Sequence, residues 1–449
     1  MATSHAATKM ESILLDRLAE ARFHTDGIFS ILTPNSFYDR PISERHRLIF
    51  YLGHLEAFDW NLLGAPLGLE SREPEFDKLF AFGIDPVDGG LPTDEPKDWP
   101  TIARVEKYRQ QIRTRLDEAL SRQDLSASKD AYLADGTLLQ VAIEHRLMHG
   151  ETLAYLLHNL PVDRKAIRLA TPPDPRRSPL PKQAKIPSGI ATLGQKRAPG
   201  VFGWDNEFET EQVIVPSFSI DVFPVTNCEY LQFVEAGGYE TMRFWKPEDW
   251  SWLKSAGLEH PHFWVPVRTA SSAEPATEWR YKTMFGEIPL PASWPVYVSH
   301  AEATAYARWA GKKLPTEEQW HRAAYGTPEG RERLFPWGDE QPEPSFGNFH
   351  YQRWDATAVN DHPEGASAFG VCDLLGNGWE WTSTPFGPLP GFQPYPFYKG
   401  YSADFFDGKH FVMKGGSPRT DACMLRRSYR NWFQPHYPYM YGSFRCVED

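Results

Sequence analysis

Two histidines stand four residues apart in a long stretch with helical periodicity. His145 and His149 lie within residues 136–159, where Ala, Leu and Glu are frequent and apolar residues recur at helical spacing. Residues four apart share one helix face, one turn above the other, so both imidazoles can reach one ion. The spacing indicates part of a metal site, although two ordinary histidines on a solvated face have the same pattern. A third ligand from another segment would favour the metal.

His54 is the candidate for that third ligand. It lies between the apolar residues Leu52 and Leu55 in a second segment with helical periodicity, 43–63. A single histidine beside a buried stripe is more often a hydrogen-bonded core residue, but opposite a His-x-x-x-His helix it supplies a third imidazole. Three neutral imidazoles that leave coordination positions open suit Fe(II), Zn(II) or copper.

Long helices must position these histidines, and the first 160 residues predict them. Apolar periodicity and capping residues predict one short helix at 74–82 and four long helices, at 10–32, 43–63, 99–122 and 136–159. Ser43 is the predicted N-cap of the second long helix. Four long helices joined by modest loops indicate a four-helix bundle, in which metal sites are built from side chains on facing helices.

A proline-rich stretch separates the predicted bundle from a region of different character. Residues 161–187 lack apolar periodicity and are rich in proline, so we expect an extended linker. The chain is therefore predicted to contain a metal-binding bundle at 1–160, this linker, and a second domain at 188–449.

The second domain is predicted to be rich in loops. Short strands, Gly and Pro turns and many aromatic residues follow the linker, and aromatic residues make up 14% of the whole chain. Alternation predicts a strand at 212–220, and helical spacing predicts helices at 299–311 and 316–325, the second capped by Thr316. We expect an α+β unit with a small sheet.

Composition excludes several classes of protein. The formal net charge of −12 argues against a general nucleic-acid binder. Residues 1–10 lack the apolar core of a signal peptide and no long apolar run follows, so we predict a cytoplasmic protein with no membrane partner. Four cysteines without Cys-x-x-Cys spacing predict neither a disulfide framework nor a zinc ribbon.

Seven motifs after the linker resemble those of the formylglycine-generating-enzyme (sulfatase-modifying factor) domain. They are FGWDNE at 202–207, PVTN at 224–227, KLPTEEQW at 313–320, GNGWEWT at 376–382, KGGS at 414–417, SYRNW at 428–432 and GSFR at 442–445. This resemblance implies a C-type-lectin-like α+β fold for residues 188–449.

The bundle adds a second resemblance. His54 together with His145-x-x-x-His149-x-Glu151 is similar to the DinB-like metal-binding bundle. The bundle followed by the second domain resembles the ergothioneine-type sulfoxide synthases, the EgtB-like family, over nearly the whole chain. In that family three histidines hold Fe(II), hercynine (Nα-trimethylhistidine) coordinates through its imidazole, a sulfur donor binds as thiolate, and O2 is the co-substrate. A carbon–sulfur bond then forms at imidazole C2.

The resemblance implies roles for individual residues of the bundle. It makes His54, His145 and His149 the Fe(II) ligands. Glu151 matches a motif glutamate, which implies that it orients a ligand. Met148 stands where many members carry a glutamine that contacts the substrate.

It also implies roles in the second domain. Asn431 and Trp432 match an Asn-Trp pair near the carboxylate and ring of hercynine. Tyr398 and Tyr401 match a Tyr-x-x-Tyr pair, in which the first is the proton or hydrogen donor to bound oxygen and the second contacts hercynine. Aromatic packing in a proline-rich loop is the alternative for these tyrosines.

Two departures from the family pattern concern the donor. Phe433 and Tyr437 stand where members that use γ-glutamylcysteine carry Asp and Arg, and neither side chain can bind the charged ends of that dipeptide. With His436 they suit a sugar ring or another thiol. Residues 44–56 also resemble the selenoneine synthase branch, which joins hercynine to a selenosugar. We therefore predict a seleno- or thio-sugar donor and selenoneine biosynthesis.

Three other hypotheses stay open. The first is an ergothioneine synthase that uses cysteine or γ-glutamylcysteine. The second is a formylglycine-generating oxidase, which needs a close cysteine pair for copper, whereas Cys423 and Cys446 lie in unrelated motifs. The third is a non-catalytic, lectin-like ligand-binding module, which would not need three histidines. The sequence predicts no oligomeric state.

Overall fold

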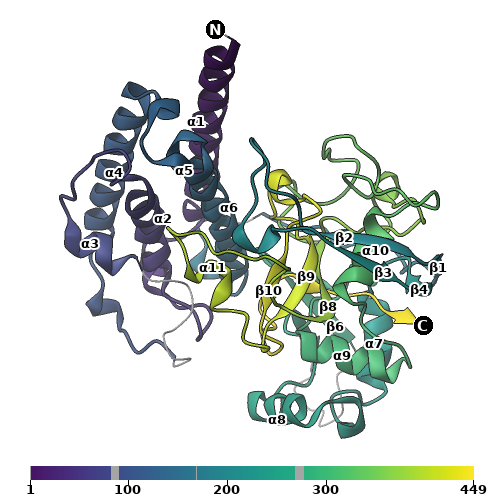
Figure 1. The fold of residues 1–449 in the computed structure, drawn as a ribbon. Helices are drawn as coiled ribbons and strands as arrows, with labels where there is room; N and C mark the ends of the chain where they lie inside the picture. Colours follow the sequence, from purple (N-terminus) through teal and green to yellow (C-terminus); the bar gives the residue numbers. More distant parts are fainter. Residues whose placement is uncertain (1, 82–90, 168, 268–277, 449) are drawn as a thin grey trace. The chain divides into compact units, whose positions relative to one another are not determined.

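A computed structural model describes residues 2–81, 91–167, 169–267 and 278–448. The chain divides into two compact units, which Figure 1 shows as ribbons. The helical unit comprises residues 1–169 together with 198–202, and the mixed unit comprises residues 170–197 and 203–449. None of the described helices is both long enough and apolar enough to cross a membrane.

Four long helices build the helical unit. They are α1 (Ala2–Phe29), α2 (Leu48–Leu63), α4 (Ile102–Arg122) and α6 (Thr137–His158). Helix α1 packs on α6, and α2 packs on both α4 and α6, which confirms the four-helix bundle. The connections contain η1 (Pro34–Tyr38), α3 (Pro74–Leu79), η3 (Pro96–Asp98), η4 (Leu125–Ala127), α5 (Ala131–Ala134) and η5 (Val162–Arg164).

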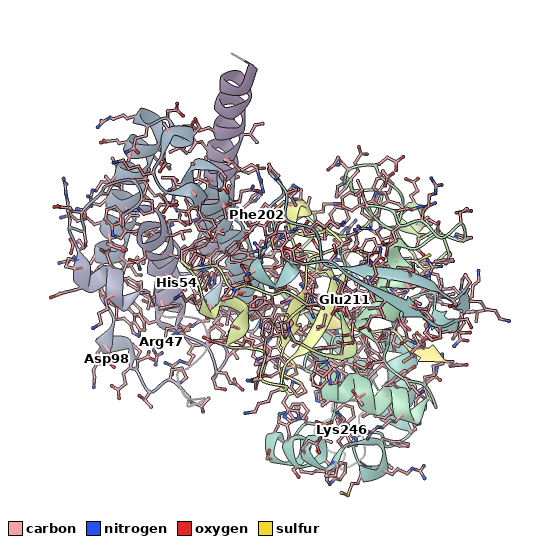
Figure 2. The ribbon with its side chains drawn as sticks, viewed as in Figure 1. Arg47, His54, Asp98, Phe202, Glu211 and Lys246 are labelled. Atoms are coloured by element: carbon pink, nitrogen blue, oxygen red, sulfur yellow. The ribbon has the colours of Figure 1, made fainter. Side chains whose placement is uncertain are left out.

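Helices α2 and α6 lie in the middle of the bundle and are buried around most of their circumference. A helix that is apolar on all sides needs neighbours on all sides, so these two carry the core of the unit. Helix α2 starts later than predicted. Arg47 occupies the extended N-cap position, while the hydroxyl of Ser43 donates to the neighbouring Glu44 carboxylate instead of capping the helix. Figure 2 labels Arg47 at this end of α2 and His54 farther along it.

Within the described residues, the mixed unit contains short strands in four small sheets. The strands are β1 (Gln183–Ile186), β2 (Gly189–Leu193), β3 (Glu211–Val215), β4 (Phe218–Asp221), β5 (Trp264–Val267), β6 (Glu278–Thr283), β7 (Gly286–Pro289), β8 (Gly378–Pro385), β9 (Phe411–Gly416), β10 (Asn431–Phe433), β11 (Gly442–Ser443) and β12 (Val447–Glu448). The sheet orders are β1-β4-β12, β10-β9-β8-β11, β2-β3 and β5-β6-β7. Strands β8 and β11 run parallel, and the other pairs are antiparallel.

The mixed unit also contains short helices. They are η6 (Asp205–Glu207), α7 (Asn227–Glu235), η7 (Met242–Phe244), α8 (Pro247–Ala256), α9 (His300–Trp309), α10 (Glu317–Tyr325), η8 (Pro363–Gly365), α11 (Gly400–Ala403) and η9 (Ala422–Met424). Helix α10 packs on β2, β3, β8 and β9, and its Trp320 lies in the apolar core. Thr316 caps α10 as predicted, because its hydroxyl accepts from the Gln319 N–H. Helix α10 therefore packs on strands of two different sheets in the α+β domain that the motifs predicted.

Two boundaries differ from the prediction. The last residues of the predicted linker, 183–186, form strand β1, which pairs with β4 and belongs to the mixed unit. The strand predicted at 212–220 is two strands, β3 and β4, which pair with different partners. Pro216 separates them because it has no N–H to donate to a ladder.

Candidate metal centre and aromatic cluster

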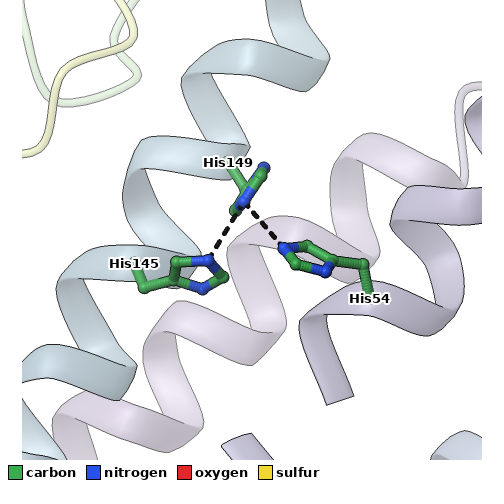
Figure 3. Close-up of side chains that lie close together, drawn as sticks. All are labelled: His54, His145 and His149. Carbon is green, nitrogen blue, oxygen red and sulfur yellow. Dashed lines mark hydrogen bonds between the residues drawn. The ribbon is translucent and has the colours of Figure 1, made fainter. Parts of the chain in front are cut away.

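Three imidazoles converge in the core of the helical unit (Figure 3). His54 comes from α2, and His145 and His149 come from consecutive turns of α6. The Nε2 atom of His149 lies 3.1 Å from the Nε2 atoms of both other histidines, and one candidate ligand atom of each residue lies within 4.8 Å of the others. Each histidine is only 3% exposed. The structure therefore brings together the three histidines that the sequence proposed as ligands.

Burial keeps these imidazoles neutral. Removal from water is the largest cause of the lowered pKa of His54, to about 4, and it holds the pKa values of His145 and His149 well below the usual range. The neighbouring imidazoles and Arg146 lower them further. A neutral imidazole has one nitrogen lone pair free, which is the form that binds a metal.

The His54 ring is fixed by its surroundings. Its Nδ1–H donates to the backbone carbonyl of Phe80 at 2.7 Å, which leaves the Nε2 lone pair facing the other imidazoles. Gly53 allows this contact, because a Cβ at that position would lie 2.6 Å from the Phe80 ring carbons. Phe50 also stacks on His54, with ring centroids 4.9 Å apart. The imidazole is therefore oriented before any ion binds.

His145 is held by a different contact. The Phe58 ring lies parallel to it, with centroids 3.4 Å apart and planes 9° apart. Phe58 is one helical turn after His54 on α2, and Phe50 is one turn before it, so α2 supplies the aromatic rings that stack on His54 and on His145 of α6.

A fully buried ion cluster joins the two helices behind the histidines. The Arg146 guanidinium donates to Glu56 at 2.9 Å and to Asp59 at 2.6 Å, and all three side chains are buried. Arg113 of α4 donates to the same Glu56 at 2.7 Å. Sequence reasoning missed this cluster. The available signals were two carboxylates in an otherwise apolar helix and an arginine between two histidines.

Two other predicted residues lie on α6 beside the histidines. Glu151 and Met148 are both half-buried. No hydrogen bond joins Glu151 to the three imidazoles in the described structure: Nδ1 of His54 bonds a backbone carbonyl, and Nδ1 of His145 and His149 have no hydrogen-bond partner. Helical rotation turns Glu151 about 200° from His149. The orienting role of Glu151 and the substrate contact of Met148 stay predictions.

An aromatic cluster gathers the residues predicted for hercynine in the mixed unit. The rings of Tyr401 and Trp432 lie 5.4 Å apart, and the rings of Tyr398 and Tyr401 lie 5.4 Å apart. Trp204 stacks on Tyr401 at 3.9 Å, and Phe386 stacks on Trp432 at 4.2 Å. The Tyr-x-x-Tyr segment thus meets Trp432 of the Asn-Trp pair, although about thirty residues separate them in sequence.

Hydrogen bonds hold the short helix α11 in this cluster. The Ser402 hydroxyl donates to the Asp205 carboxylate, and the Asn206 amide donates to the Ser402 hydroxyl at 3.0 Å. Ser402 follows Tyr401 directly, so η6 fixes the segment that carries the tyrosines. Burial raises the pKa of Asp205 to about 6.

The tyrosine hydroxyls keep their protons. Burial, and then the nearby Asp205 charge, raises the pKa of Tyr398 to about 12. Burial raises the pKa of Tyr401 well above its usual value. Both phenols are therefore hydrogen donors at neutral pH.

The residues predicted to select the sulfur or selenium donor begin on the face of strand β10 opposite to Trp432. Side chains alternate along a strand, so Trp432 lies on the opposite face from Asn431 and Phe433. Phe433 stacks on Tyr437 with centroids 5.3 Å apart. The two residues from which we predicted the donor are therefore in contact.

His436 differs from the prediction. Its Nε2 lies 2.8 Å from the Asp249 carboxylate, and its ring stacks on Trp252 at 4.6 Å. Both partners belong to α8, so this imidazole is engaged with a helix rather than with Phe433 and Tyr437.

Comparison with known proteins matches each unit to a family. Residues 17–153 match the DinB superfamily, and residues 169–449 match the sulfatase-modifying factor enzyme 1-like domain. The order of the two confirms the predicted organisation of a DinB-like bundle followed by this domain.

Several relatives are similar over most of this chain. A hercynine oxygenase of Mycolicibacterium smegmatis is 36% identical over 322 residues, which cover 70% of this chain and 72% of that protein. A hercynine oxygenase of Mycobacterium tuberculosis is 35% identical over 340 residues, which cover 72% of this chain and 75% of that protein. Ergothioneine biosynthesis protein 1 of Neurospora crassa is 28% identical over 500 residues, which cover 93% of this chain and 56% of that protein.

Proposed function

The chain belongs to the hercynine oxygenase family of ergothioneine-type sulfoxide synthases, and from this premise we propose that it joins a chalcogen donor to the imidazole C2 of hercynine with consumption of O2. Membership of the family makes it an enzyme of the sulfoxide synthase type. The observation that carries the proposal is the convergence of three buried, neutral imidazoles in a chain with these relatives.

The donor set of the helical unit fits Fe(II). Three imidazole Nε2 atoms face one another with no acidic hydrogen-bond partner between them, and lone pairs so placed repel unless a proton or a cation lies among them. His54, His145 and His149 would hold the metal, leaving positions open for ligands. The chemistry that Fe(II) supplies when bound is the activation of O2 and of a coordinated donor.

The mixed unit supplies groups suited to hercynine. A trimethylammonium group has no N–H to donate, so it is recognised by aromatic faces rather than by acceptors. Trp204, Tyr401 and Trp432 present such faces within one cluster. We assign to Asn431 the contact with the carboxylate and to the Tyr398 hydroxyl the donation of a proton or hydrogen atom, which its raised pKa leaves in place at neutral pH.

The donor that we propose is a 1-seleno- or 1-thio-sugar, so the direct product is hercynine joined through selenium or sulfur to the sugar. Selenoneine or its sulfur counterpart then forms only when a separate step cleaves the bond between the sugar and the chalcogen. Phe433 and Tyr437 have no charge to offer to a dipeptide, and each is stacked on the other. A charged dipeptide would lose water without gaining charge-assisted hydrogen bonds, at a cost of several kcal/mol. A sugar ring is neutral and has an apolar face that packs on aromatic rings. A second candidate, ergothioneine synthesis from cysteine or γ-glutamylcysteine, is favoured by the similarity to hercynine oxygenases and to an ergothioneine biosynthesis protein.

One experiment separates the two donors. Protein loaded anaerobically with Fe(II) is mixed with hercynine, O2 and, separately, cysteine, γ-glutamylcysteine, a 1-thio-sugar and a 1-seleno-sugar, and the products are identified by mass spectrometry. We expect the sugar donors to exceed γ-glutamylcysteine by at least about a hundredfold in kcat/KM, which is roughly 2.7 kcal/mol in transition-state binding. Faster turnover of γ-glutamylcysteine would refute the sugar donor. No product from any donor would refute the enzymatic proposal.

The double variant Phe433→Asp/Tyr437→Arg provides the matched test of specificity. It restores the charged pair of γ-glutamylcysteine users, and it should shift the kcat/KM ratio toward the dipeptide. An unchanged ratio in a folded, iron-loaded variant would show that these two positions do not select the donor.

A further inference from the structure

The helical unit carries a groove that the proposed reaction does not use. It lies between α4 and the segment 64–73 that follows α2, and its volume is about 560 Å³. None of the three converging histidines lines it. The volume falls in the range of small-molecule sites, which runs from roughly 300 to 1,000 Å³.

Two arginines in this groove lack an acidic partner. Arg115 of α4 and Arg72 of the preceding segment both line it, and neither has a carboxylate within salt-bridge distance among the described residues. Burial lowers the pKa of Arg115, the neighbouring Arg72 charge lowers it further, and the Asp77 carboxylate, which is not within salt-bridge distance, opposes them. Adjacent like charges are destabilising, so this pair is costly unless an anion joins it.

The acidic groups around the groove already have partners. Glu73 lies 3.7 Å from Arg104, and Glu118 lies 3.4 Å from Arg122. Asp77 accepts hydrogen bonds from the hydroxyls of Ser71 and Tyr108, at 2.5 and 2.7 Å. The guanidinium groups of Arg72 and Arg115, which have no carboxylate within salt-bridge distance, are therefore the charged groups available to bind a ligand.

Arg115 is held in position for binding. Its guanidinium lies over the Trp60 ring, 4.4 Å from the centroid, and one Nη donates to the Glu70 carbonyl at 2.6 Å. These contacts occupy one edge and one face of the Arg115 guanidinium. They already restrict the side chain, so less of its conformational entropy is lost when a ligand binds. A planar guanidinium with remaining N–H donors matches the oxygens of a phosphate.

Polar side chains continue along the same face of α4. Gln111 and Thr114 precede Arg115 by four residues and by one, and both are exposed in the groove. Their amide and hydroxyl groups can bind the hydroxyls of an organic ligand attached to the phosphate.

We propose that this groove binds a small phosphorylated metabolite, with its phosphate or diphosphate group held by Arg72 and Arg115. The site is separate from the proposed metal centre, so it binds its ligand whether or not the proposed reaction is correct. The size of the groove favours a small molecule over a protein or nucleic-acid partner, and the net charge of −12 opposes binding of a nucleic acid.

Calorimetric titration of the full-length protein at low salt tests the site. The ligands are inorganic phosphate, pyrophosphate and ADP, which separate a simple anion site from one that also recognises an organic group. We expect saturable binding of pyrophosphate or ADP with Kd below about 1 mM, and a loss of at least tenfold in Arg72→Gln and Arg115→Gln. Lys129→Gln, which removes an exposed charge outside the groove, should change Kd less than twofold.

Two further measurements keep the result interpretable. Arg115→Lys retains the charge but loses the planar group, so it should bind more weakly than the wild type and melt at a similar temperature. Weaker binding than about 1 mM by the wild type, or binding that the arginine variants leave unchanged, would overturn the proposal. So would tighter binding of a phosphorylated peptide or an RNA than of ADP through the same arginines, because the ligand would then be a macromolecule.

Discussion

At the scale of single residues, the neutral state of the three histidines is the property that matters most. Their burial removes the proton that would compete with a metal, and a backbone carbonyl and two phenylalanine rings orient two of the imidazoles. Packing therefore orients these imidazoles for an ion, and no acidic residue of the described structure joins the three histidines as a candidate ligand.

Replacing one histidine should remove iron binding. His149 lies 3.1 Å from both other imidazoles, so His149→Ala leaves two nitrogens, which hold a labile Fe(II) poorly. We expect bound iron per chain to fall at least tenfold after anaerobic loading, measured by elemental analysis. His24→Ala, which changes a partly exposed histidine of α1, is the control and should load normally. Full iron occupancy in His149→Ala would remove this residue from the site.

Removing one hydroxyl tests the proposed hydrogen donor. Tyr398→Phe keeps the ring in the aromatic cluster but removes the phenol that its raised pKa keeps protonated. We expect KM for hercynine to change little and kcat to fall by roughly 10²- to 10⁴-fold, or the donor to be oxidised without bond formation, measured by steady-state kinetics and product analysis. Tyr401→Ala, which removes the aromatic face assigned to hercynine, should instead raise KM. If Tyr398→Phe forms the normal product at the normal rate, another group must donate the proton or hydrogen atom.

At the scale of elements, buried polar contacts decide how helices and loops present the functional residues. The ion cluster of Arg146 joins α6 to α2, and the Asp205–Ser402 contact joins η6 to α11. Each links segments far apart in sequence, and each lies within three residues of a proposed site residue.

Arg146→Met should destabilise the bundle strongly. It removes the cation that bridges Glu56 and Asp59: Glu56 keeps Arg113, but Asp59 keeps only a 4.0 Å contact with Arg22. Breaking a buried pair costs about 3–5 kcal/mol. Chemical denaturation should show this loss in the free energy of unfolding of the helical unit. Arg122→Met removes an exposed arginine that pairs with Glu118, and it should cost less than about 1 kcal/mol. Equal losses in the free energy of unfolding would show that the buried cluster contributes no more to stability than the exposed pair.

Asp205 should give the mixed unit a pH-dependent stability. Its folded pKa, about 6, is above its ordinary value of 3.8, so the folded state binds the proton more tightly than the unfolded state. This contribution to stability is complete below pH 4 and is lost as pH rises through 6, by an amount on the order of 2–3 kcal/mol. Thermal melting at pH 4.5 and 7.5 should show Asp205→Asn gaining stability relative to the wild type at the higher pH. A constant difference between the two proteins would refute the shifted pKa.

At the scale of the whole molecule, the two units have separate tasks in the proposed reaction. The helical unit holds the candidate metal centre, and the mixed unit holds the aromatic cluster. The proposed reaction therefore requires both units for turnover.

Trp432→Ala should separate these tasks. The change removes an aromatic face from the mixed unit and leaves the three histidines untouched. We expect iron loading equal to the wild type, with turnover of hercynine reduced at least tenfold, on the scale of lost aromatic and cation contacts. Trp337→Ala, a half-buried tryptophan away from this cluster, is the control. Loss of iron in Trp432→Ala would show that iron binding by the helical unit depends on this residue of the mixed unit.

The sequence by itself determined the features that depend on short-range spacing. The four-residue interval between His145 and His149, the helical periodicity around them and the N-cap at Thr316 follow from neighbours along the chain. The motifs identified both domains and their order, and the comparisons confirmed them. Local backbone geometry carries this information, because side chains three or four apart always share a helix face.

Only the tertiary structure decided which distant residues meet. His54 joins the other histidines because α2 packs on α6, and no spacing in the sequence states that packing. The same holds for the cluster around Arg146, for the contact of Ser402 with Asp205, and for His436, which is engaged by α8. Buried charges take the partner that the packed core offers, since an unpaired charge there costs several kcal/mol. That partner is set by how the helices and sheets pack and not by periodicity along the chain.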